Sequence, residues 1–248
     1  MTTLFRPLSI FILAIAPFFS EKTAAQQPVF TLDDTLRGSI TAERAWWDVA
    51  YYDLNVRVNP GDKSISGANA IRYRVLESGQ TMQIDLQPPL RIERAEQDGQ
   101  ALDVRQIGTN AWLVDLKKAQ KPGAVETLTV TYSGKPRKAR NAPWDGGFSW
   151  AKDGQGRPFV ATSCQGLGAS AWWPCKDHAY DEPDSQTIRV TVPEPLMDVS
   201  NGRLRRTTVN ADSTRTFEWH VSNPINNYGV NVNIAVYEHF ADTFQGEK

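Results

Sequence analysis

The sequence predicts an all-β fold, an antiparallel or mixed β-sandwich built from many short strands. Apolar and polar side chains alternate through several segments, among them 52–58 and 126–132, and this period of two is typical of half-buried strands. Seventeen glycines and fifteen prolines interrupt the chain at short intervals, which favours short strands over long helices. Between residues 46 and 132 no segment has the 3.6-residue period of an amphipathic helix.

Turn residues between the alternating segments predict three hairpins. They pair 52–58 with 66–76, 90–96 with 102–106, and 203–208 with 214–220. Asp98-Gly99 in the second hairpin is a typical two-residue turn. The alternation is imperfect within 66–76, which indicates a β-bulge. Further strands are expected at 187–192 and 230–237.

The composition is that of an ordinary soluble globular protein. The chain has 248 residues, of which 40% are hydrophobic and 22% charged, and its formal net charge is −1. This size suits one large β-domain, and eight tryptophans provide for a sizeable core. Because the net charge is close to zero and no long basic run is present, a nucleic-acid partner is not expected.

Residues 1–25 have the pattern of a secretory signal peptide. Arg6 gives a positive start, an apolar run follows from Leu8 to Phe19, and Ala24-Ala25 offers small residues for cleavage before Gln26. The apolar run is short for a membrane span, although a short membrane anchor is the alternative. We therefore expect an exported protein, periplasmic or secreted, with no membrane segment after cleavage.

After the signal peptide the chain is expected to divide into three parts. Residues 26–45 are a polar leader, within which 31–38 is expected to form a helical turn that ends at Gly38. Residues 46–240 form the β-domain. Residues 241–248 are a polar tail without a core or cap signal.

The segment from Thr162 to Pro183, which we call the Cys-Trp segment, departs from the alternating pattern. It contains both cysteines, five small residues between 166 and 171, the run Trp172-Trp173-Pro174 and an acidic end. Small residues allow a close backbone approach or a positive φ, and an anchored loop of unusual shape is a frequent place for function. A tight crossover between two sheets, with the tryptophans in the core, is the alternative interpretation.

Three short motifs in this segment carry a resemblance to a known family. They are Ser163-Cys164-Gln165, Pro174-Cys175 and Asp181-Glu182-Pro183. In this order they resemble the N-terminal domain of the zinc aminopeptidases of the aminopeptidase N and leukotriene hydrolase type, the gluzincins. The resemblance extends from about Tyr51 to Phe240 and implies a saddle-like β-domain. One residue separates cysteine and acid in relatives, whereas five separate Cys175 from Asp181, so the matching acid is either Asp177 or Asp181.

Gln165 is the candidate substrate-binding residue that the resemblance implies. In the family, the matching Gln or Glu faces the active site and accepts a hydrogen bond from the free α-amine of the peptide substrate, for which a carboxamide oxygen is suited. A neutral Gln holds an ammonium group less strongly than a Glu does, because it lacks the charge. Judged from the residues alone, Gln165 is an ordinary loop side chain.

The family's zinc-binding motif is absent from this sequence. None of His178, His220 and His239 is followed by Glu-x-x-His, and the family's Gly-x-Met-Glu-Asn motif is missing too. The resemblance places both motifs in a catalytic domain that follows this one. No catalytic residue, metal ligand or cofactor is therefore expected in this chain, and zinc is expected in the missing domain. The acidic loop with His178, Asp181, Glu182 and Asp184 is better explained by caps and turns than by a metal.

Cys164 and Cys175 allow two interpretations. Two cysteines in an exported protein favour a disulfide, which requires Cα atoms within about 7 Å of each other. Cytosolic relatives carry cysteines at matching positions, which implies packing rather than a bridge.

Three functions follow from these observations. The first is the cleft-forming N-terminal domain of an exported zinc aminopeptidase, which removes N-terminal residues from peptides only together with its catalytic domain; little or no activity is expected of this chain alone. The second is a stand-alone exported module that binds carbohydrate through Trp144, Trp150, Trp172 or Trp173. The third is a purely structural exported domain.

Overall fold

The computed structural model describes residues 29–142 and 145–246. The chain divides into two compact units, Met1–Phe30 and Thr31–Lys248, and the second contains the helices and strands of the described residues. The predicted signal peptide lies outside the described residues, as does Trp144. No helix within 29–142 or 145–246 has both the length and the apolar character that a membrane crossing requires.

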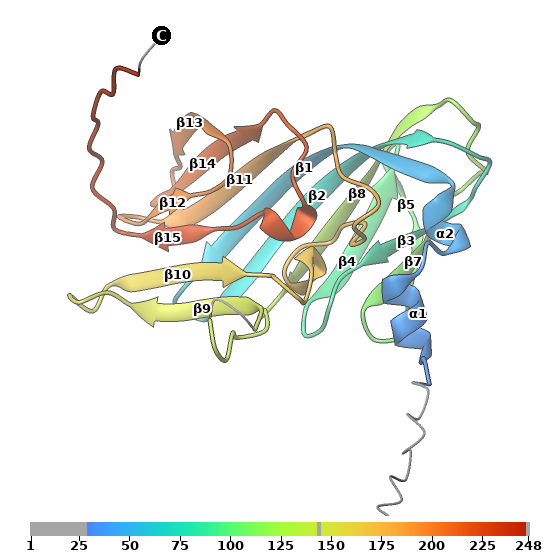
Figure 1. Cartoon of the computed structure of the whole chain (residues 1–248), viewed down its shortest axis with the longest axis horizontal. Helices are drawn as coiled ribbons and strands as arrows, with labels where there is room; N and C mark the ends of the chain where they lie inside the picture. Colours follow the sequence, from blue (N-terminus) through green and yellow to red (C-terminus); the bar gives the residue numbers. More distant parts are fainter. Residues whose placement is uncertain (1–28, 143–144, 247–248) are drawn as a thin grey trace, which may run out of the picture. The chain divides into compact units, whose positions relative to one another are not determined.

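Strands dominate the second unit (Figure 1). Its helices are α1 (Leu32–Gly38) and α2 (Ala42–Ala45), with the 3-10 turns η1 (Ala169–Ala171) and η2 (Asn227–Gly229). Its strands are β1 (Trp47–Asn59), β2 (Ser64–Val75), β3 (Thr81–Asp85), β4 (Arg91–Gln97), β5 (Gln100–Ala101), β6 (Asp103–Ile107), β7 (Ala111–Asp115), β8 (Val125–Gly134), β9 (Gly147–Lys152), β10 (Pro158–Ser163), β11 (Ser185–Pro193), β12 (Met197–Val199), β13 (Arg203–Val209), β14 (Thr214–Val221) and β15 (Asn233–Ala235).

The largest sheet is mixed and has eight strands in the order β13-β14-β11-β1-β2-β8-β4-β5. β1 and β11 run parallel, and their outer neighbours β2 and β14 are antiparallel to them. Leu54, Val56 and Val58 of β1 are buried, whereas Asn55 and Arg57 between them are exposed. The alternation in the sequence therefore identifies the face of the sheet that packs on the core.

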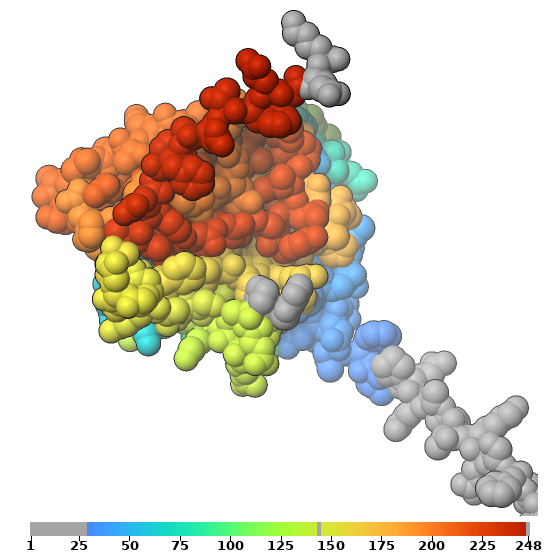
Figure 2. Space-filling view, turned by 60° about the vertical axis from the view of Figure 1, so that its left-hand side comes forward, coloured from blue at the N-terminus to red at the C-terminus, as the bar shows by residue number. Residues whose placement is uncertain are grey.

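Two smaller antiparallel sheets complete the fold, in the orders β12-β15-β10-β9 and β3-β7-β6. In the space-filling view the yellow β9–β10 hairpin lies against the red segment that contains β15, its partner in the sheet (Figure 2). Leu54 of β1, Ile84 of β3 and Val160 of β10 belong to one hydrophobic core. The sheets therefore share a core, and the prediction of an all-β fold is confirmed.

Two of the three predicted hairpins are confirmed, and the third, between 90–96 and 102–106, is present only at its turn. β1 pairs with β2, β4 pairs with β5 across Asp98-Gly99, and β13 pairs with β14. After β5 the chain leaves the large sheet, because β6 pairs with β7 instead. The β-bulge predicted within 66–76 lies instead in the partner strand, where Ala50 of β1 is the additional residue between Val49 and Tyr51.

Two further expectations concern the ends of the domain. The helical turn expected at 31–38 is α1, which begins with a capping box between Thr31 and Asp34. The last strand is shorter than predicted, since β15 contains only Asn233–Ala235. Val230 and Val232 are buried without belonging to the strand, so the alternation there reflects burial in the core rather than strand pairing.

Candidate functional site

The loop that follows β10 presents Gln165 to the surface. The N–H groups of Leu167 and Gly168 both donate to the carbonyl oxygen of Cys164, at 3.2 and 2.9 Å, and close a tight turn. Gly166 and Gly168 have φ of 80° and 88°, a region that favours glycine. Gln165 and Gly166 are exposed at the tip of this turn, which we call the Gln165 loop (residues 164–168).

Gln165 lies at an open pocket with a volume of about 320 Å³. Its side chain has no hydrogen bond to any other described residue, so the carboxamide is free for a ligand. The pocket walls come from the end of α1, the Gln165 loop, the loop before β11 and η2. The lining residues with polar side chains are Arg37, Gln165, Asp177, His178, Asp181, Glu182, Asn226, Asn227 and Tyr228.

Asp177 fixes the chain immediately after the loop. Its carboxylate accepts hydrogen bonds from the backbone N–H groups of Ala169 and Ser170, at 3.2 and 3.0 Å, and from the Ser170 hydroxyl at 2.6 Å. A Cβ atom added to Gly168 would lie 2.1 Å from an Asp177 carboxylate oxygen. Gly168 is therefore required by close approach as well as by its positive φ.

Lys176 and Asp181 form a buried ion pair beside the pocket. The Lys176 Nζ lies 2.6 Å from Asp181 Oδ2 and donates to the carbonyl oxygen of Trp47 at 2.5 Å. It also lies 4.3 Å from the centre of the Trp47 ring and 4.6 Å from that of the Tyr180 ring. Burial lowers the pKa of Lys176 and raises the pKa of Asp181, and the attraction between the two charges opposes both shifts. This pair closes the loop before β11 against the start of β1.

Asp181 and Asp177 hold different segments of the backbone, whichever of them matches the acid of the family motif. Asp181 also accepts from the N–H of Val49, at 3.2 Å. The backbone N–H of Asp177 donates to Asp85 Oδ2 at 2.9 Å. Both carboxylates are used to hold backbone segments together.

Trp172 and Trp173 are core residues. Both are fully buried, and the Trp173 ring meets the Tyr52 ring edge-on, with centroids 5.0 Å apart. The Trp172 ring lies 6.1 Å from Phe148. Stacking of Trp172 or Trp173 on a sugar, two of the four tryptophans that the binding-module hypothesis offered, is therefore wrong, because a stacking surface must be exposed. Trp150 is half-buried and stacks on Phe148, with centroids 5.0 Å apart.

Cys164 and Cys175 are both buried, and both are free thiols in the structure. Burial raises the pKa of Cys164 to about 12 and raises the pKa of Cys175 well above its ordinary value. Both side chains therefore contribute to the core as small apolar groups, and a disulfide between them stays a prediction.

The described residues do not fit a zinc ion. Within 29–142 and 145–246, no three His, Cys, Asp or Glu side chains are grouped so that they could hold a metal. In the acidic loop, Asp181 is paired with Lys176 and Asp184 with Arg74, while His178 Nε2 lies 3.4 Å from the carbonyl oxygen of Gly38.

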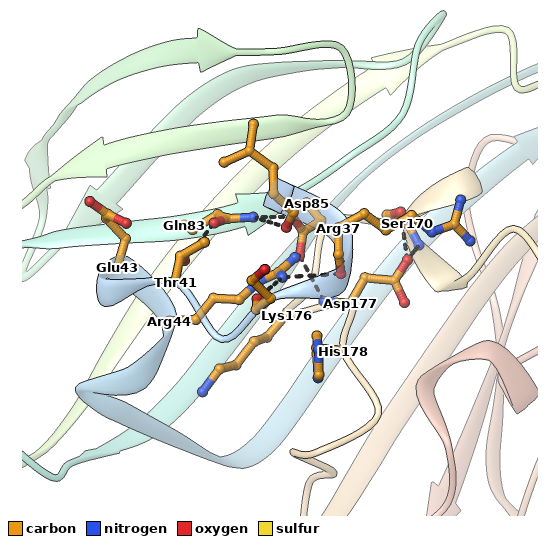
Figure 3. A network of polar contacts seen from close by, with 12 residues as sticks. Arg37, Thr41, Glu43, Arg44, Gln83, Asp85, Ser170, Lys176, Asp177 and His178 are labelled. Atoms are coloured by element: carbon orange, nitrogen blue, oxygen red, sulfur yellow. Dashed lines mark hydrogen bonds and ion pairs between the residues drawn. The ribbon is translucent and has the colours of Figure 1, made fainter. Parts of the chain in front are cut away.

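Sequence reasoning missed a second group of polar residues behind the loop. Arg44 and Asp85 form a buried ion pair at 2.5 Å, and Arg37 donates to the carbonyl oxygen of Gly166, also at 2.5 Å. Figure 3 shows Arg37, Arg44 and Asp85 together with Ser170, Lys176 and Asp177. Arg44 and Asp85 are 41 positions apart in the chain, and Arg37 and Gly166 are 129 positions apart. No local sequence pattern could therefore have indicated either contact.

Solved structures with a similar fold include M1 zinc metallopeptidases and an LTA4 hydrolase. The M1 zinc metallopeptidase from Deinococcus radiodurans is 24% identical with a TM-score of 0.65, over 77% of this chain and 42% of that one. Its complex with a Tyr-Ser-Ala substrate gives 23% identity and a TM-score of 0.65, over 77% and 43%. Yeast LTA4 hydrolase gives 18% identity and a TM-score of 0.60, over 76% and 29%. A search of curated proteins gave no match.

These comparisons define the class of the protein as an N-terminal β-domain of the metallopeptidase type. A sequence profile of the Peptidase M1 N-terminal domain matches residues 49–228, which is most of the chain. The chain therefore belongs to the M1 peptidase family and contains its N-terminal domain, as the resemblance predicted. It spans less than half the length of the solved relatives.

Proposed function

We propose that this chain is the cleft-forming N-terminal domain of an exported zinc aminopeptidase, and that Gln165 accepts a hydrogen bond from the free α-amine of a peptide. Membership of the M1 peptidase family supports peptide hydrolysis as the reaction of the complete protein. In the complete protein, zinc binding and peptide hydrolysis would belong to a catalytic domain packed against this one, because the described residues do not fit a zinc site.

The observation that carries this proposal is the position of Gln165. The side chain is exposed at the pocket and makes no hydrogen bond to another described residue. A carboxamide oxygen with two free lone pairs can accept from an ammonium group. Asp177 and Glu182 line the same pocket, and their negative charge favours a cationic ligand, which partly offsets the neutrality of Gln165.

A peptide titration followed by NMR tests the role of Gln165 in this chain. The probe is Tyr-Ser-Ala, and its N-acetylated form is the matched control because acetylation removes the ammonium group. We expect weak binding, with a Kd on the order of 1 mM or above, and shifts of the Gln165 side-chain NH2 signals with the free peptide only. Equal shifts with both peptides, or none at Gln165, would count against the proposal.

Gln165→Ala and Gln165→Glu extend the same test. Ala should abolish the difference between the two peptides, whereas Glu should strengthen binding of the free peptide several-fold, because a charge-assisted hydrogen bond is roughly twice as strong as a neutral one. If Glu weakens binding, the ligand group at this position is not a cation.

Two parts of the proposal need separate observations. Export rests on the sequence of residues 1–25 alone, and the mass of the mature protein should show cleavage before Gln26. The catalytic partner should appear as an in-frame His-Glu-x-x-His downstream of Lys248 in the gene. The hypothesis of a carbohydrate-binding module is not favoured, because Trp172 and Trp173 are buried. Binding of the isolated chain to a glycan array would support that hypothesis instead.

A further inference from the structure

The Gln165 loop is held in place by side chains from outside the loop. Gly166 and Gly168, with their positive φ, leave little intrinsic stiffness on either side of Leu167, since glycine loses more conformational freedom on folding than other residues. Arg37 donates to the carbonyl oxygen of Gly166 at 2.5 Å, and Gln87 donates to that of Leu167 at 2.7 Å. These two side chains therefore restrict a turn that its own sequence leaves loose.

Arg37 is itself fixed, because it lies in the last turn of α1 and that turn is tied to the rest of the domain. Gln83 donates to the carbonyl oxygen of Leu36 at 3.0 Å. Arg44 donates to the carbonyl oxygens of Arg37 and Ser39, at 3.4 and 3.0 Å. These hydrogen bonds fix the backbone that carries Arg37, and so they fix the starting point of its guanidinium relative to the Gln165 loop.

Asp85 connects both sides of this arrangement. It pairs with Arg44 and accepts from the backbone N–H of Asp177, whose carboxylate in turn caps Ala169 and Ser170 (Figure 3). The same buried carboxylate therefore anchors the end of α1 and the chain that leaves the Gln165 loop.

We propose that Arg37 is a positioning residue for Gln165: by fixing the carbonyl of Gly166, it sets the direction in which the Gln165 carboxamide enters the pocket. The profile of the M1 N-terminal domain begins at residue 49, so α1 and α2 lie outside the region through which the family was recognised. The ligand of Gln165 rests on the proposed function, whereas the positioning of the loop does not.

Backbone dynamics of the 248-residue chain test the proposal. The variants are Arg37→Met, which keeps the apolar stem, and Arg37→Lys, which keeps the charge. Arg57→Met is the matched control, because Arg57 is exposed like Arg37 and its guanidinium also has a single long-range partner, Asp212 at 3.0 Å. We expect the 15N order parameter of Gly166 to fall from about 0.85 to below about 0.6 in Arg37→Met, to be partly restored in Arg37→Lys, and to stay unchanged in Arg57→Met.

Peptide binding is the second readout. The apparent Kd for Tyr-Ser-Ala should rise about three- to tenfold in Arg37→Met, with no change in Arg57→Met. An unchanged order parameter at Gly166 overturns the positioning role. So does a melting temperature more than about 4 °C below that of Arg57→Met, a loss of about 1 kcal/mol or more for a domain of this size, because Arg37 would then serve global stability. If Gly166 becomes mobile while Gln165→Ala leaves peptide binding unchanged, the positioning role holds and the proposed function fails.

Discussion

At the residue scale, three buried carboxylates in this domain have different environments. Asp85 is paired with Arg44 and Asp181 with Lys176. Asp198 on β12 is 1% exposed and has no ion pair with any described residue; its Oδ2 accepts from the Trp219 Nε1 at 2.9 Å. Because desolvation is opposed only by hydrogen bonds, burial raises the pKa of Asp198 to about 8.

Asp198 should make the stability of the domain depend on pH. Below about pH 4 the carboxyl is protonated in both the folded and the unfolded chain. As the pH rises from about 4 to 8, the unfolded chain releases this proton while the folded chain retains it, so the free energy of unfolding falls, by at most about 1.4 kcal/mol per pH unit. Asp198→Asn keeps an acceptor for Trp219 and should remove this loss.

Urea unfolding of wild type and Asp198→Asn at pH 4.5 and pH 7.5 measures the effect. We expect the variant to be more stable than wild type at pH 7.5 by a few kcal/mol, and the two to be similar at pH 4.5. If the difference between the two proteins is the same at both pH values, Asp198 is ionised in the folded state and its environment differs from the one described above.

At the scale of single elements, the sequence predicted what local chemistry determines. The hairpin turns and α1 were found because turn and capping residues act within a few positions. The parallel pairing of β1 with β11 and the contact of Arg37 with Gly166 were not found, since such pairs leave no periodic signal. Gln165 was found only through the family resemblance, because nothing in its neighbours distinguishes it from other loop residues.

The two glycines of the Gln165 loop allow a matched test of this element. In Gly166→Ala the new Cβ has no atom within 4 Å, so the only cost in stability comes from the positive φ. In Gly168→Ala the new Cβ would also lie 2.1 Å from the Asp177 carboxylate. We expect a loss of about 1 kcal/mol for the first and at least about 2–3 kcal/mol for the second. Thermal or urea unfolding checks the difference, and equal losses would mean that the Asp177 carboxylate moves aside freely.

At the scale of the whole molecule, the segment 31–45 is part of the folded unit that contains the strands. Leu36 of α1 and Arg44 of α2 are buried, and Asp33 accepts from the N–H and hydroxyl of Thr109 at 2.7 and 2.6 Å. From the sequence this segment was expected to be a polar leader, because its few apolar residues give no period over so short a length. Its integration depends on a handful of long-range contacts, chief among them Arg44 with Asp85.

Truncation should show how much the domain depends on that segment. A chain that begins at residue 46 lacks Arg44 and leaves the Asp85 carboxylate buried without its partner, a change that typically costs about 3–5 kcal/mol. We expect it to be less stable than a chain that begins at residue 31 by at least this amount, or not to fold. Asp85→Asn in the shorter chain should recover part of the loss, because it removes the unpaired charge. If both chains unfold at the same urea concentration, α1 and α2 do not stabilise the β-domain, and the fixed position of Arg37 would need another explanation.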